Sequence, residues 1–132
     1  MEFLSSNKKI VAQNILIQIE EAIIKIQHRT HEIRNADDFL LTPAGMEKLD
    51  AACMLLIAIG ESLKNLDKVT EKKLLITDST IPWSDVMGVR DIIAHHYFNV
   101  DAEEIWWIIS QELTPLLNSI RNFIKLLASD SQ

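Results

Sequence analysis

The segment 42-TPAGMEKLDAACMLLIAIGESLKNL-66 predicts a long helix at the centre of an all-α fold. Thr42 has a side chain suited to an N-cap, and Pro43 occupies the first helical position, where proline is favoured. Residues 51–60 are apolar on every side. Such a stretch is expected to be covered all round, either by the rest of the domain or partly by a second subunit.

Helical periodicity continues towards the N-terminus, over residues 8–34. Apolar side chains recur there at helical spacing on one face, which is formed by Val11, Ile15, Ile19, Ala22, Ile26 and Ile33. A second apolar strip repeats every seven residues, at Ile10, Ile17 and Ile24. Two strips predict two neighbours for this helix. Residues 35–41 are expected to be a connection.

Two more helices are predicted towards the C-terminus. Pro82 lies in the first turn of a third helix, which is expected to end near His95. Asp101 and Glu104 form a capping box at the start of the last helix, which is expected to run to about Leu127 and to bend just before Pro115. Residues 67–81 are polar, with one short turn. We therefore predict a single domain over residues 1–132, built as a four- to five-helix up-and-down bundle.

Composition narrows the class of protein further. Thirteen Lys and Arg against nineteen Asp and Glu give a net charge of −6, which argues against nonspecific coating of nucleic acid. The single cysteine, Cys53, is expected to be a core residue in a reducing compartment. The longest apolar run is about half of the roughly 20 residues that span a bilayer, and no signal-peptide pattern is present. These features predict a cytoplasmic protein that does not enter a membrane.

The densest group of chemically active side chains is 90-RDIIAHHY-97, at the end of the third helix. Arginine offers a planar fork for phosphate oxygens, and histidine exchanges protons near neutral pH. Together, Arg90 and His95 suffice for metal-free cleavage of RNA, or for binding a nucleotide without cleavage. The simpler interpretation is a helix end with a surface cation and a histidine favoured by the helix dipole.

Spacing within this group sets a geometric condition. Asp91 and His95 are four residues apart, so the carboxylate could orient the imidazole. Arg90 and His95 are five residues apart, about 140° around an ideal helix. These two side chains converge on one substrate only if the helix ends or distorts near Ala94, if the long arginine reaches round, or if two chains share one cleft.

The pattern Arg90-x4-His95-x-Tyr97 resembles the R-x4-H-x-Y motif of the HepT-like HEPN toxins. The resemblance extends to the surrounding sequence and covers most of the chain, from the first helix to the last. The other similar segments are Ile59-Gly60-Glu61, Ile81-Pro82-Trp83, residues 87–90, residues 97–101 and Trp106. It implies a HEPN-like homodimer that acts as a ribonuclease toxin, without a metal or other cofactor and without DNA as a substrate.

The resemblance also implies roles for individual residues. Arg90 and His95 would be the catalytic pair, facing a cleft that two subunits share. Asp91 would support the site, and supporting roles for Glu61 and His96 stay open. Tyr97 matches the tyrosine to which a partner antitoxin, a nucleotidyltransferase of the MNT type, transfers AMP.

Two alternatives remain at this point. The chain could be a noncatalytic helical subunit that binds a nucleotide or a nucleotidyltransferase partner, with Arg90 and His95 contacting phosphate without chemistry. It could also be a plain helical interaction module. RNA binding by so acidic a chain requires a concentrated basic patch, and the sequence does not show where its thirteen Lys and Arg gather in space.

Overall fold

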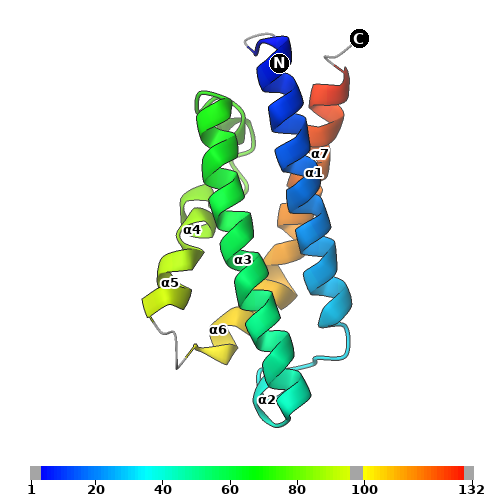
Figure 1. Ribbon diagram of the computed structural model, residues 1–132, viewed down its shortest axis with the longest axis vertical. Coiled ribbons are helices and arrows are strands. Elements are labelled where there is room, and N and C mark those ends of the chain that lie inside the picture. The colour runs from blue at the N-terminus through cyan, green and yellow to red at the C-terminus, as the bar shows by residue number, and fades with distance from the viewer. Residues whose placement is uncertain (1–3, 96–99, 130–132) are drawn as a thin grey trace.

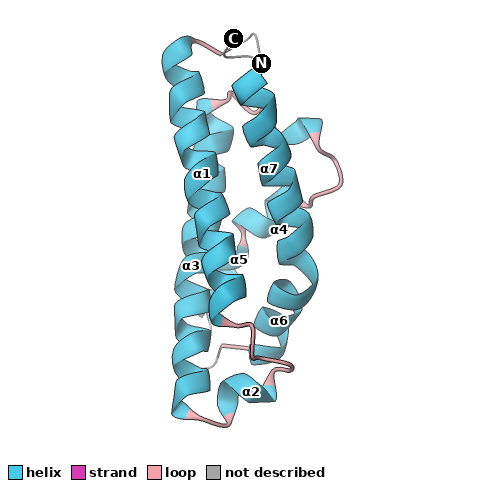
Figure 2. Cartoon of the chain, turned by 90° about the vertical axis from the view of Figure 1, so that its right-hand side faces the viewer, coloured by secondary structure: helices cyan, strands magenta, loops and turns pink. Residues whose placement is uncertain are grey.

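The computed structural model describes residues 4–95 and 100–129, and within this part of the chain the regular elements are helices joined by turns and short connections, without strands. Three long helices lie side by side: α1 (Ser6–Arg29), α3 (Pro43–Val69) and α7 (Leu113–Ser129) (Figure 1). The shorter helices are α2 (Asp37–Leu40), α4 (Trp83–Met87), α5 (Val89–His95) and α6 (Ala102–Trp107). Successive rods α1, α3, α4–α5 and α6–α7 run up and down (Figure 2). The predicted all-α bundle is confirmed.

The helix starts follow the capping residues seen in the sequence. Thr42 Oγ1 accepts a hydrogen bond from the Gly45 backbone N–H at 2.9 Å, with Pro43 at the first helical position. Asp101 Oδ1 accepts from the N–H groups of Glu103 and Glu104 at the start of α6. Each cap satisfies backbone donors that a helix leaves unpaired in its first turn. Both predicted N-caps are confirmed.

The core lies between α1, α3 and α7. Fully buried side chains come from all three helices, with additions from α2 and the turn η1 (Leu75–Thr77); the largest include Leu16, Ile23, Phe39, Leu63, Leu75 and Leu113. Cys53 is among the buried residues, as predicted, and burial beside Asp50 raises the pKa of its thiol to about 11. Within the described residues, no helix is both long enough and apolar enough to cross a bilayer.

Three predicted boundaries were wrong. α1 ends at Arg29 rather than near residue 34. At this end the Thr30 hydroxyl bonds the Ile26 carbonyl at 2.7 Å, and the next N–H, that of His31, bonds a carbonyl only three residues back. The connection that follows holds a short helix, α2. The third helix is broken into α4 and α5 at Gly88, whose N–H bonds the Ser84 carbonyl.

The last rod bends where Pro115 predicts. Proline has no N–H to donate to the carbonyl four residues earlier. The chain forms a π-helical turn, η2 (Ile108–Glu112), directly before α7, and so widens the helix ahead of the proline. Because of this turn, the axes of α6 and α7 point in different directions (Figure 2).

Two apolar surfaces that the sequence predicts to be covered are exposed in the single chain. The second strip of α1, formed by Ile10, Ile17 and Ile24, lacks the predicted neighbour and lies open. In the apolar centre of α3, Met54 is 72% exposed and Ala58 is also exposed. The single chain therefore leaves exposed part of the apolar surface that its sequence predicts to be covered.

Candidate functional site

The predicted motif begins on α5, beside α3. Arg90 lies in the first turn of α5, and its Nη1 donates to Glu61 Oε1 on α3 at 3.1 Å. The side chains of Arg90 and Glu61 are 58% and 43% exposed. The structure thus brings together two of the predicted site residues, 29 positions apart in the sequence.

Glu61 lies between two cations. The same oxygen that accepts from Arg90 lies 3.8 Å from Lys64 Nζ, one turn further along α3. Exposed ion pairs contribute little free energy, roughly 0–1 kcal/mol, because water and salt screen them. A phosphate group can therefore replace Glu61 as the partner of the Arg90 guanidinium, which presents a fork suited to phosphate oxygens.

Gly60 explains why α5 comes so close to α3. A Cβ added at this position would lie 3.3 Å from the Val86 carbonyl oxygen, 3.4 Å from the Met87 carbonyl oxygen and 3.5 Å from Val89 Cγ1. The junction between α4 and α5 therefore packs its backbone directly on the glycine. This contact determines the position along α3 at which Arg90 meets Glu61. The feature of the sequence that indicates it is an isolated glycine inside a helix.

A polar network fixes the start of α4. The buried Ser119 hydroxyl on α7 donates to Asp78 Oδ2 at 2.6 Å, while Trp83 Nε1 donates to the Asp78 carbonyl at 2.9 Å. Hydrogen bonds from Ser119 and then Thr80 lower the pKa of the Asp78 carboxyl below its usual range. The hydrogen bond between Ser119 and Asp78 could not be predicted from the sequence, because the two residues are 41 positions apart.

Ser119→Ala is expected to lower the free energy of unfolding by about 1.5 kcal/mol at pH 7, because it removes a hydrogen bond to a carboxylate. A folded-state pKa below the unfolded value stabilises above the unfolded pKa, about 3.9 for Asp. That stability is lost as the pH falls through the folded pKa. Urea unfolding at pH 7 and pH 3 should show the deficit shrinking at the lower pH. Ser110→Ala, which removes an exposed serine hydroxyl that donates to the Trp106 carbonyl, is the matched control.

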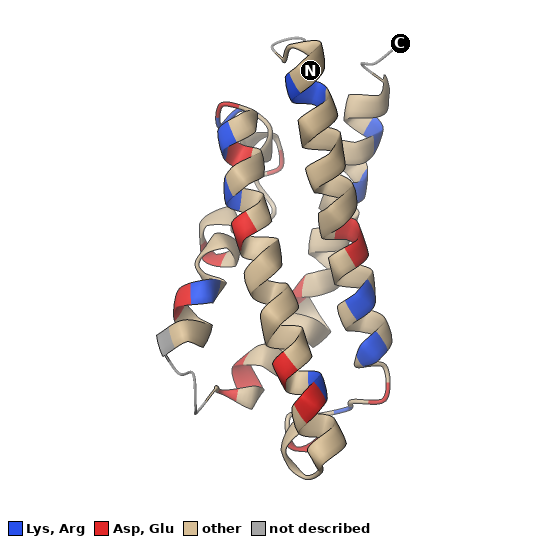
Figure 3. Cartoon of the chain, viewed as in Figure 1, with Lys and Arg blue, Asp and Glu red and all other residues tan. Residues whose placement is uncertain are grey.

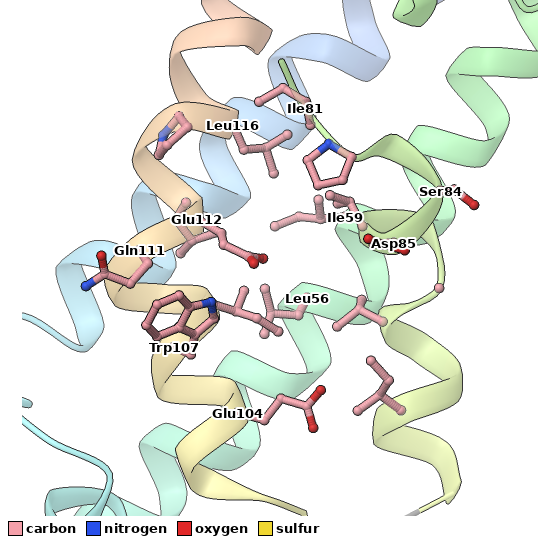
Figure 4. Close-up of a pocket in the computed structure, with 18 of the residues that line it drawn as sticks. Leu56, Ile59, Ile81, Ser84, Asp85, Glu104, Trp107, Gln111, Glu112 and Leu116 are labelled. Carbon is pink, nitrogen blue, oxygen red and sulfur yellow. The ribbon is translucent and has the colours of Figure 1, made fainter. Parts of the chain in front are cut away.

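A groove of about 600 Å³ lies on the other side of α5, between α4–α5 and α6–η2 (Figure 4). Its walls are mostly apolar, and Val89 and Ile92 of α5 contribute to them. Asp85, Glu104 and Glu112 line it as well, whereas no Lys, Arg or His does among the described residues. Trp107, which also lines the groove, is 59% exposed. Three carboxylates and no cation in this lining make the groove unsuited to phosphate.

The remaining predicted residues are placed in part or not at all. Asp91 is exposed on α5, next to Arg90, and His95 is the last residue of that helix. The side chain of His95 and the whole of His96 and Tyr97 lie outside the described residues. α5 includes both Arg90 and His95, the residues that follow it (96–99) lie outside the described part, and the convergence of Arg90 and His95 stays a prediction.

Comparison with known proteins identifies the class of helical protein to which this fold and this motif belong. The model of the family described as ribonuclease HepT-like matches residues 19–123, most of the chain. The chain therefore belongs to the HepT-like family. The match includes Glu61, Arg90 and Tyr97, and it confirms the resemblance drawn from the sequence.

Individual relatives agree with this assignment. "Probable ribonuclease HepT" of Thermococcus cleftensis is 30% identical over 104 residues, which is 79% of this chain and 87% of the relative. Two proteins named "Putative RNase" also match. One, from Caldanaerobacter subterraneus subsp. tengcongensis, is 34% identical over 51% of this chain and 56% of its own length. The other, from Methanocaldococcus jannaschii, is 30% identical over 56% of this chain and 58% of its own length.

The chain thus spans just over half the length of these two relatives. No solved structure gives a significant match.

Proposed function

We propose that this chain is a metal-independent endoribonuclease in which Arg90 and His95 act on one phosphodiester. The observation that carries the proposal is that Glu61 holds the exposed guanidinium of Arg90, a residue of α5, the helix that also bears His95. Membership of the HepT-like family and the names of the relatives support RNA as the substrate.

The reaction needs only groups that RNA and these side chains supply. The 2′-oxygen attacks the adjacent phosphorus, and the bond from phosphorus to the 5′-oxygen breaks, leaving a cyclic phosphate and a 5′-hydroxyl. His95 carries the proton: its neutral imidazole takes the proton from the attacking 2′-hydroxyl, and the resulting imidazolium gives it to the leaving 5′-oxygen. Arg90 stabilises the charge that builds on the phosphate oxygens.

The direct test is incubation of the purified protein with RNA in the presence of a chelator. We expect cleavage that leaves cyclic phosphate ends and that 2′-O-methylation of the RNA prevents, since the methyl group removes the attacking hydroxyl. RNA left intact by the folded protein would contradict the proposal and favour the noncatalytic binding subunit.

We further propose that the active form is a homodimer, with the second copy on the groove beside α5. Trp107 and Ile92 leave apolar surface exposed at this groove. A second copy that covers them by a twofold contact would place its own α5 close by, so that two Arg90–His95 pairs adjoin one cleft. Twofold pairing is the commonest way in which a chain associates with itself.

Trp107→Glu is expected to convert the dimer into a monomer, because it places a charge in an apolar contact that already holds three carboxylates. Light scattering after size-exclusion chromatography measures the mass directly. Ile76→Glu is the control, since Ile76 is 72% exposed and does not line the groove. A Trp107→Glu dimer would place the interface elsewhere.

The chain is proposed to be the toxin of a toxin–antitoxin pair, neutralised by a nucleotidyltransferase that transfers AMP to Tyr97. The added phosphate and nucleoside would block RNA by charge and by volume. After co-expression with such a transferase, intact mass should show AMP adducts on the wild-type chain and none on Tyr97→Phe. Adducts that persist in the variant would move the modified residue elsewhere.

A further inference from the structure

Lysines gather at one end of the bundle. Residues 4–11 and 62–73 hold six of them: Lys8, Lys9, Lys64, Lys68, Lys72 and Lys73. Only Asp67 and Glu71 oppose them within these two segments, which gives the two segments together a charge of +4 and leaves −10 for the rest of a chain whose total is −6. Figure 3 shows basic residues at the start of α1 and at the end of α3, which lie at the same end of the bundle. This is the kind of concentrated patch that RNA binding requires of an acidic chain.

A groove of about 420 Å³ runs between the start of α1 and the end of α3 within this patch. We call it the lysine groove. Its lining residues are Asn7, Lys8, Val11, Asn65, Lys68 and Val69, and none of these six described residues is a carboxylate. Ammonium groups bind phosphate oxygens, and asparagine amides both donate and accept hydrogen bonds, as ribose hydroxyls and base edges require.

Two of these lysines pair with Glu71 at long distances. Lys8 Nζ lies 3.4 Å from Glu71 Oε1, and Lys73 Nζ lies 3.8 Å from Glu71 Oε2. All three side chains are about half exposed, so water and salt screen both pairs. A phosphate can replace Glu71 at Lys8 at little cost.

In the turn after α3, charged residues occupy positions whose backbone conformation favours glycine. Glu71 and Lys72 have φ angles of 57° and 60°, in the left-handed region. Their N–H groups bond the carbonyls of Lys68 and Asp67, which is the hydrogen-bond pattern of a Schellman cap. Strained backbone of this kind is concentrated at functional sites. Here it carries Glu71, Lys72 and Lys73 beside the groove.

The lysine groove is continuous with the Arg90 site along α3. Glu61, which holds Arg90, is followed at three and seven residues by Lys64 and Lys68, so the distance along the helix from Glu61 to Lys68 is about 10 Å. We propose that RNA flanking the scissile phosphate runs along α3 into the lysine groove, where Lys8 and Lys68 bind its backbone. This inference rests on the proposed ribonuclease function and names where its substrate extends.

The test compares two double variants that each remove one lysine from α1 and one from α3. Lys8→Gln with Lys68→Gln empties the groove of its cations, whereas Lys25→Gln with Lys48→Gln changes the opposite ends of the two helices. Affinity for a long 2′-O-methylated RNA, which cannot be cleaved, is measured over a range of salt concentrations. In the groove variant we expect affinity to fall about tenfold at low salt, and the slope of log K against log salt to fall by about 1.4, since two phosphate contacts are lost.

Cleavage of a dinucleotide completes the design. The single phosphate of a dinucleotide is the scissile one at Arg90, which leaves no phosphate for Lys8 or Lys68, so the groove variant should cleave it as well as the wild type does. An unchanged affinity and salt slope, an equal loss in the control, or an equal loss on the dinucleotide would overturn the inference. If the wild type cleaves nothing but the groove variant still loses affinity and slope, the ribonuclease function fails and the RNA-binding groove stands.

Discussion

His95→Ala should lower RNA cleavage by about 10²–10⁴-fold, the usual contribution of a positioned proton-transfer group. Arg90→Ala should lower it by about 10²–10³-fold, as expected when a donor to the developing charge is removed. Arg90 is exposed on α5, so its removal should hardly change the free energy of unfolding. Arg90→Lys should restore only part of the rate, because lysine keeps the charge and loses the planar fork.

Controls for this pair lie at the end of α1. His28 and Arg29 are exposed in the last turn of α1, so His28→Ala and Arg29→Ala remove the same chemical groups away from the candidate site. Single-turnover cleavage of RNA, with circular dichroism to verify folding, measures all four variants. Equal rates for the wild type and either α5 variant would show that the substituted residue takes no part in cleavage. Growth of cells that express each variant without antitoxin gives an independent measure of toxicity.

Much of the fold was predictable because it depends on local signals. Thr42 with Pro43 and Asp101 with Glu104 determine helix starts through hydrogen bonds between residues only two or three positions apart, and Pro115 determines the bend by lacking a donor. Helix ends were less predictable. α1 ends at Arg29, although the apolar pattern continues to Ile33.

The sequence named candidate site residues but not their contacts. The motif named Arg90 and the wider resemblance named Glu61, but nothing in the sequence shows that α5 reaches α3 at Glu61, because that contact depends on the missing Cβ of Gly60. The lysine groove was invisible for a related reason. Lys8 and Lys68 are 60 positions apart, and only the packing of α1 on α3 places both of them along one groove.

Gly60→Leu should have the largest effect on stability among the surface and site variants. Its Cβ would lie 3.3–3.4 Å from the backbone carbonyl oxygens of Val86 and Met87, and further atoms would have to displace the α4–α5 junction. Overpacking of this kind costs about 1–3 kcal/mol, and contact with backbone favours the upper end. Because the junction carries Arg90, cleavage should also fall, by about 10²-fold for a displacement near 1 Å.

Two further variants separate close packing at Gly60 from the effect of adding a leucine anywhere on α3. Gly60→Ala adds only the Cβ, which neighbours accommodate by shifting a few tenths of an ångström, and it gains about 1 kcal/mol of helix propensity. Its stability should stay close to that of the wild type. Ala58→Leu introduces the leucine at an exposed position two residues away and should change the unfolding free energy by less than about 0.5 kcal/mol. Urea unfolding gives the order: Gly60→Leu well below the other two. If Gly60→Leu matched Ala58→Leu in stability and in cleavage rate, close packing at Gly60 would not be what positions Arg90.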